Sequence, residues 1–75
     1  NKTELKPWAA KISNGNFEEK TYTVEEEIST REWVKQHKDD KNSILPFFIV
    51  NTEGIKRPFH YNDTIDEGEK IIYLE

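Results

Sequence analysis

Apolar and polar positions alternate along much of this chain in short runs, which predicts several strands and little helix. The segments 8–12 and 17–24 are predicted strands. Asn14 and Gly15 lie between them, and this pair is typical of a tight hairpin because both residues tolerate positive φ. The second segment ends in Thr, Tyr, Thr and Val, which all favour strand over helix.

The clearest local signal marks the start of a helix. Ser29 and Glu32 have the spacing of a capping box, with Ser29 as the N-cap and Glu32 reaching back to its amide. Ile28 and Trp33 have the spacing of a hydrophobic staple. We therefore expect a helix from Thr30 to about Lys38. Its inward-facing side chains are expected to be Trp33, Val34 and His37.

Three further strands are predicted at 44–50, 55–59 and 70–74, separated by turns around Gly54 and Gly68. The order of elements predicts an α+β fold, in which one short helix packs on a small mixed β-sheet. Residues 1–7 are polar and end in a proline, so they are a predicted linker or frayed N-terminal end. Residues 8–75 would form a single domain, with 8–20 as a hairpin extension.

Composition excludes several classes of function. The 75 residues contain no cysteine, which excludes a disulfide framework, thiol catalysis and a cysteine-based zinc site. A net charge of −4 argues against nucleic acid as a partner. The longest apolar run, Ile44–Val50, is too short for direct membrane insertion, which takes about 20 residues. The chain has no methionine, so we expect it to be part of a longer protein.

Few residues suggest catalysis. His37 fits no metal-binding spacing and is expected to be a half-buried residue near a helix end. His60 lies in the segment 57–63, where a cation, an imidazole, an amide and a carboxylate could hold a small ligand or simply build a turn. The acidic run 25–27 could bind a cation, but a solvated edge beside the helix N-terminus is the favoured interpretation. No phosphate loop or nucleophile motif is present, so a non-enzymatic protein is predicted.

The apolar residues exceed what one short helix can cover. The segments 44–50 and 71–74 are apolar on both faces, whereas a single helix covers one face of a small sheet. A second copy of the chain could cover the other face, which predicts a homodimer. The alternative is that the segment around Trp8 folds over it.

The second half of the chain resembles a known family. Leu45–Asn51, the turn at Gly54 and Asn62–Leu74 together are similar to the TrkA-C domain, the C-terminal lobe of RCK regulatory domains. The shared pattern is an apolar strand entered near a proline, a glycine turn, an Asp-Thr pair, and a glycine followed by an acidic residue and a final apolar strand. Residues 21–28 and the helix after them resemble the start of that domain. Glu69 replaces the usual Asp, and the region 8–16 has no counterpart.

This resemblance implies a cytoplasmic regulatory, ligand-sensing domain of a potassium or sodium transport protein, such as a cation/proton antiporter or a potassium-uptake system. It implies a soluble domain at the cytoplasmic face of the membrane, joined to the transmembrane part of the same parent protein and acting as a dimer. Some members bind a cyclic dinucleotide or another small ligand between two copies, and the ligand here is unknown. The positions expected at the ligand site or dimer interface are Ile49, Val50, Asn51, Arg57 and His60.

A second resemblance is to β-grasp modules, which share the order of strand, capped helix and strand before a final Asp-Thr and Gly-Glu strand. The chain ends in Leu74-Glu75 and lacks the Gly-Gly end of sulfur carriers, which use a terminal carboxylate. The alternative function is therefore a TGS-like interaction module of a soluble protein.

Overall fold

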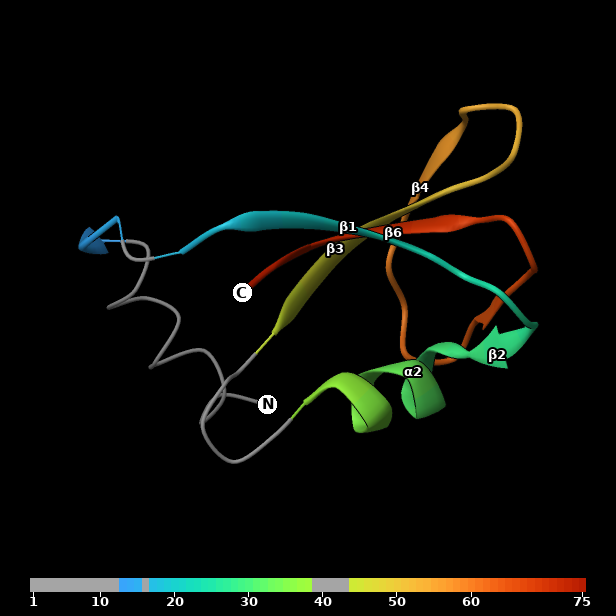
Figure 1. The fold of residues 1–75 in the computed structure, drawn as a ribbon, viewed down its shortest axis with the longest axis horizontal. Coiled ribbons are helices and arrows are strands. Elements are labelled where there is room, and N and C mark those ends of the chain that lie inside the picture. The colour runs from blue at the N-terminus through green and yellow to red at the C-terminus, as the bar shows by residue number, and fades with distance from the viewer. Residues whose placement is uncertain (1–12, 16, 39–43) are drawn as a thin grey trace.

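The computed structural model describes residues 13–15, 17–38 and 44–75. Four strands form an antiparallel sheet in the order β1-β6-β3-β4, and two very short strands, β2 and β5, form a separate antiparallel pair (Figure 1). The elements in chain order are β1 (Glu19–Thr23), β2 (Ile28–Ser29), α2 (Thr30–His37), β3 (Leu45–Val50), β4 (Lys56–Pro58), β5 (Thr64–Ile65) and β6 (Lys70–Leu74).

The helix and the β2–β5 pair lie on one side of the four-stranded sheet (Figure 1). This arrangement confirms the predicted α+β class with one short helix on a small sheet. Where the sequence predicted a mixed sheet, all strand pairings among the described residues are antiparallel. The predicted strand at 70–74 and the predicted start of the helix at Thr30 agree with the structure.

Strand β6 is central because it pairs with β1 on one side and with β3 on the other. Its pairing with β3 shifts register between Pro46 and Phe48, so that Phe47 has no partner residue on β6. Such a bulge is the expected place for a proline in a strand, because proline cannot donate to the ladder.

The N-terminus of α2 is held as the sequence predicts. Ser29 has extended backbone, and its Oγ accepts a hydrogen bond from the Glu32 amide at 3.1 Å. Ile28, the other half of the predicted staple, packs against the core cluster that contains Trp33. Ser29 also pairs with Thr64 in the β2–β5 ladder. One residue thus both ends a strand and caps a helix.

Replacing Ser29 with alanine should lower the free energy of unfolding by about 1 kcal/mol, because the Glu32 amide loses its acceptor. Urea unfolding followed by far-UV circular dichroism measures this change. Ser29→Asp, which keeps an acceptor at the N-cap, is the matched control and should stay within about 0.5 kcal/mol of the parent chain. Equal losses in both variants would contradict the cap.

Trp33 is the centre of the hydrophobic core. It is 1% exposed, and the fully buried Ile49, Ile65 and Ile71 belong to the same cluster. Four rings surround the indole, with centroids between 4.5 and 6.2 Å from it: Tyr22, His37, Phe59 and Tyr73. The helix is therefore fixed to the sheet mainly through one side chain.

The structure corrects the prediction in two places. The predicted hairpin turn needs positive φ at both Asn14 and Gly15, but in the described ranges only glycines have positive φ, with Gly15 at 67°. The β2–β5 pair was missed, because two residues per strand are too few to give an alternating pattern. The predicted strand at 8–12 and the predicted linker at 1–7 lie outside the described residues.

Candidate functional site

Arg57 lies at the centre of an ionic network. Its Nε donates to Asp63 Oδ2 at 2.9 Å, and its Nη1 donates to Glu69 Oε2 at 2.8 Å. Its Nη2 donates to Glu69 Oε1 at 3.2 Å and to the Thr64 carbonyl at 3.1 Å. Glu69 is only 6% exposed. A two-pronged guanidinium contact suits a buried carboxylate, because each oxygen receives its own donor.

This network has a clear electrostatic signature. Hydrogen bonds from Arg57, opposed by partial burial, lower the pKa of both Asp63 and Glu69 below the ordinary values. The same contacts raise the pKa of Arg57. The three groups are therefore all charged at neutral pH.

Asp63 connects this network to the helix. Its backbone carbonyl accepts from the Thr30 amide at 3.0 Å and from the Thr30 hydroxyl at 3.2 Å. Thr30 is fully buried at the first turn of α2. The Arg57 side chain thus ties β4 to β5, to Glu69 just before β6 and, through Asp63, to the start of the helix. All three guanidinium nitrogens of Arg57 donate hydrogen bonds within the chain, which makes it a structural clamp.

The other predicted site residues do not share one surface. Ile49 lies opposite Arg57 in the β3–β4 pair but is 0% exposed, so it offers no surface to a ligand or a second copy. Val50 pairs with Lys56 one position along, which places it on the opposite face of the sheet. Asn51 uses its side-chain oxygen to accept from the amides of Glu53 and Ile55, both at 2.9 Å. His60 is exposed in the loop after β4.

His37 has the role that the sequence favoured. It is half-buried at the end of α2 and stacks on Trp33 with ring centroids 4.5 Å apart. Its Nδ1 lies 2.9 Å from the Trp33 carbonyl oxygen. Because a carbonyl oxygen only accepts, Nδ1 is the donor of this hydrogen bond. Among the described residues, no three His, Asp or Glu side chains converge in a way that could hold a metal ion.

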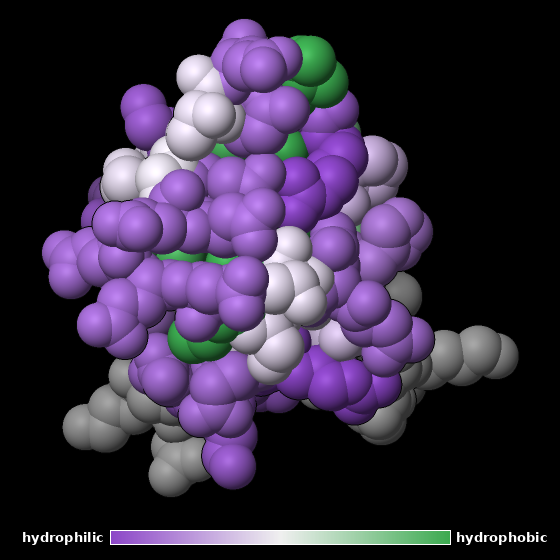
Figure 2. Space-filling model, turned by 90° about the vertical axis from the view of Figure 1, so that its right-hand side faces the viewer, coloured by the Kyte–Doolittle hydropathy of each residue, from purple (hydrophilic) through white to green (hydrophobic). Residues whose placement is uncertain are grey.

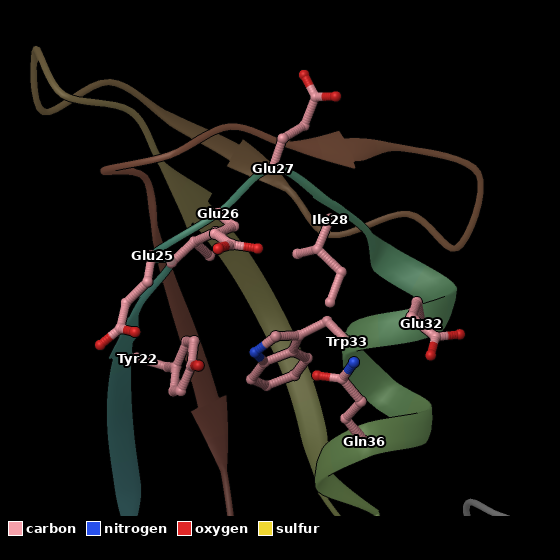
Figure 3. A pocket seen from close by; sticks show the side chains of 9 residues that line it. Tyr22, Glu25, Glu26, Glu27, Ile28, Glu32, Trp33 and Gln36 are labelled. Atoms are coloured by element: carbon pink, nitrogen blue, oxygen red, sulfur yellow. The ribbon is translucent and has the colours of Figure 1, made fainter.

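A pocket of about 350 Å³ opens between β1, the acidic segment 25–27 and α2. Tyr22 and Trp33 form its aromatic part (Figure 3), and four glutamates are among its lining residues. The indole nitrogen of Trp33 points toward the side where Tyr22 and Glu26 lie (Figure 3). That nitrogen is buried and has no hydrogen-bond acceptor in the part of the chain that the structure describes. The residues that line the pocket are Tyr22, Val24, Glu25, Glu26, Glu27, Ile28, Glu32, Trp33 and Gln36.

Nothing in the sequence pattern joins these residues into one site. The acidic run was visible, but its position over the aromatic core depends on β1 pairing with β6, which lies some 50 residues away. Trp33 was correctly predicted to face inward, yet an unpaired indole N–H is a property of packing and leaves no mark on the sequence.

The face of the sheet away from α2 is a second surface of interest. Register places Phe48, Ile72 and Pro58 in one row across β6, β3 and β4, on the side opposite Ile49 and Ile71. We call the exposed and half-buried apolar residues of this side the outer face: Phe48, Val50, Pro58 and Ile72. Leu74 follows Ile72 on the same side but is only 8% exposed. Phe48 is 41% exposed, and Lys56 lies over its ring at 5.9 Å. By contrast, the end of the molecule with the β3–β4 turn and β2 shows a mainly hydrophilic surface (Figure 2).

In the described residues, no helix is both long and apolar enough to pass through a bilayer. Comparison of the chain with protein-family models, curated proteins and solved structures gives no match.

Proposed function

We propose that this chain is a non-enzymatic, ligand-sensing regulatory domain of a membrane potassium or sodium transport protein, and that it works as a homodimer. In this proposal it lies at the cytoplasmic face of the membrane. The resemblance to TrkA-C domains suggests the class of parent protein. The outer face is the observation that carries the proposal, because it is the surface through which two copies would act together.

The segments that carry the resemblance support the proposal by their position. Residues 45–51 form β3 and its exit, and residues 62–74 contain β5 and β6. Strands β3 and β6 are paired neighbours at the centre of the sheet. The motifs therefore belong to one structural unit, as expected when a resemblance reflects a shared fold.

The outer face supports association of two copies. Aromatic residues are enriched in protein interfaces, and Phe48 of the outer face is 41% exposed. Full burial of a Phe side chain contributes about 2 kcal/mol relative to full exposure. Less than half of that gain remains for Phe48, which is 41% exposed. A two-fold interface contains this ring from both copies, so the gain from its burial counts twice. The β4 edge of the sheet is less suitable, because β4 has three residues and ends at Pro58, which has no amide proton to donate.

We expect sedimentation velocity to show a dimer at micromolar to millimolar concentration. Phe48→Glu should weaken the dimer at least about tenfold, because a charge replaces an aromatic side chain in the interface. Ile55→Glu is the matched control, since Ile55 is 60% exposed in the β3–β4 turn and lies outside the outer face. A strict monomer, or equal weakening by both variants, would contradict this part of the proposal.

The parent protein provides an independent test. Sequencing the gene around the codon for Asn1 should show several transmembrane helices in the same polypeptide. A parent without such helices would reject the transport assignment and favour the alternative, an interaction module of β-grasp type in a soluble protein.

A further inference from the structure

The pocket beside Trp33 differs from the Arg57 network in one decisive respect. Arg57, Asp63 and Glu69 satisfy one another, whereas the Trp33 Nε1–H has no acceptor within the described residues. A buried N–H donor without an acceptor destabilises a fold by about 1–3 kcal/mol. Nearly all buried donors in folded proteins are paired, so each exception calls for an explanation.

The surroundings of this donor specify what could pair with it. Glu25, Glu26 and Glu27 lie on the segment at one rim of the pocket, and Glu32 lies on α2. The carboxylates of Glu27 and Glu32 point away from the Trp33 ring, whereas Glu26 lies on the side toward which the indole nitrogen points (Figure 3). The lining contains no Lys or Arg. Four carboxylates without a basic residue create a negative potential, which favours a cation and rejects an anion. These carboxylates are spread around the rim and do not converge as metal ligands do among the described residues.

We propose that this pocket binds a small organic cation that also carries a carbonyl or hydroxyl oxygen. The ammonium group interacts with the Glu26 carboxylate, and the oxygen accepts a hydrogen bond from Trp33 Nε1. This inference deepens the proposed ligand-sensing function by naming the chemical class of ligand.

The dimensions and lining of the pocket fit such a molecule. A volume of about 350 Å³ is near the lower end for small-molecule sites, which suits a compact metabolite. Tyr22 and Ile28 provide apolar surface for an aliphatic stem between the two polar groups. The indole nitrogen has less than 1 Å² of exposed surface, so side chains beside it must move before a ligand oxygen can reach it. Exposed side chains rotate within nanoseconds.

Three matched probes separate the two contacts. Lysinamide carries ammonium groups and a carbonyl oxygen. Cadaverine has the ammonium groups without the carbonyl, and hexanamide has the carbonyl without an ammonium group. In ¹H–¹⁵N NMR titrations at low salt, we expect lysinamide to bind with a dissociation constant on the order of 1 mM. Cadaverine and hexanamide should each bind at least about fivefold more weakly, because each lacks one contact.

The indole cross-peak of Trp33 reports the hydrogen bond directly. Lysinamide should move it downfield, as expected when an N–H gains an acceptor, while cadaverine should leave it nearly unchanged. Trp33→Phe identifies this peak by its loss, and Trp8→Phe identifies it by elimination if the first variant does not fold. Equal binding of lysinamide and cadaverine, or an unmoved indole peak, would overturn the proposed hydrogen bond.

Surface substitutions test the ionic contact without disturbing the core. Glu26→Gln keeps the shape of the side chain and should weaken lysinamide binding about threefold to tenfold. Glu53→Gln makes the same charge change on the β3–β4 turn, outside the pocket, and should leave binding within about 1.5-fold of the parent. Equal effects of the two variants would overturn the site.

Failure of the pocket proposal can be distinguished from failure of the proposed dimer. Glu26→Gln should leave the sedimentation coefficient unchanged, and Phe48→Glu should leave lysinamide binding unchanged, because the pocket and the outer face lie on different surfaces. If the chain forms a dimer but binds none of the three probes, the pocket assignment alone is overturned.

Discussion

Replacing Trp33 with alanine is expected to lower the free energy of unfolding by about 4 kcal/mol, the largest effect of any single substitution considered for this chain. Large-to-small changes of a buried aromatic residue cost about 3–5 kcal/mol. Here the ring also contacts four other rings, two of which, Tyr22 and Tyr73, lie on the paired strands β1 and β6. A domain of 75 residues has a total stability of roughly 4–11 kcal/mol. Trp33→Ala should therefore be largely or wholly unfolded in urea far below the midpoint of the parent chain.

Trp33→Phe is the informative control for this prediction. It leaves a smaller cavity than alanine and removes the N–H that has no acceptor among the described residues. The gain from losing an unsatisfied donor offsets part of the lost packing, so we expect a cost of about 1 kcal/mol. Urea unfolding monitored by circular dichroism gives both values. If phenylalanine costs as much as alanine, the indole N–H must have a partner that stabilises the fold.

The second large effect is expected at the ionic clamp. Arg57→Ala should cost about 2–3 kcal/mol, because it leaves the nearly buried Glu69 without its main partner. Breaking a fully buried ion pair costs more than this. The loss is smaller here because the Arg57 side chain is 36% exposed to solvent. Arg31→Ala is the matched control, because Arg31 is exposed and donates one hydrogen bond to Asn62. It should cost less than about 0.5 kcal/mol. Similar losses in the two variants would contradict the clamp.

Acid should remove the same stabilisation. Arg57 lowers the pKa of Asp63 and Glu69 in the folded state, whereas carboxyl groups of an unfolded chain titrate near pH 4. Below about pH 5 the unfolded state therefore binds more protons than the folded state. The free energy of unfolding should be highest above that pH and fall as the pH drops through 4 toward the folded-state values. Urea midpoints between pH 7 and pH 3 measure this slope, which should be shallower in Arg57→Ala than in the parent chain.

Local signals in the sequence predicted the parts of the fold that depend on neighbouring residues. The Ser29 cap, the inward position of Trp33 and the strand at 70–74 all follow from short-range chemistry, and the structure agrees with each. The partners of Arg57 could not be predicted in this way. Asp63 and Glu69 come within hydrogen-bonding distance of Arg57 only after the loop that follows β4 and the turn at Gly68 have formed. The pocket depends on contacts between residues still farther apart in the sequence, because β1, which carries Tyr22, must first pair with β6.

The position of β6 between β1 and β3 also constrains how the chain folds. Thr21 of β1 pairs with Ile72 of β6, so this contact closes a loop of about 50 residues. Contacts of such long range slow folding, and antiparallel domains rich in them fold in milliseconds to seconds. During synthesis, β1 and β3 remain without their shared neighbour until β6 has emerged. A chain that stops before residue 70 should expose both strands together, and aggregation from that intermediate is the expected result.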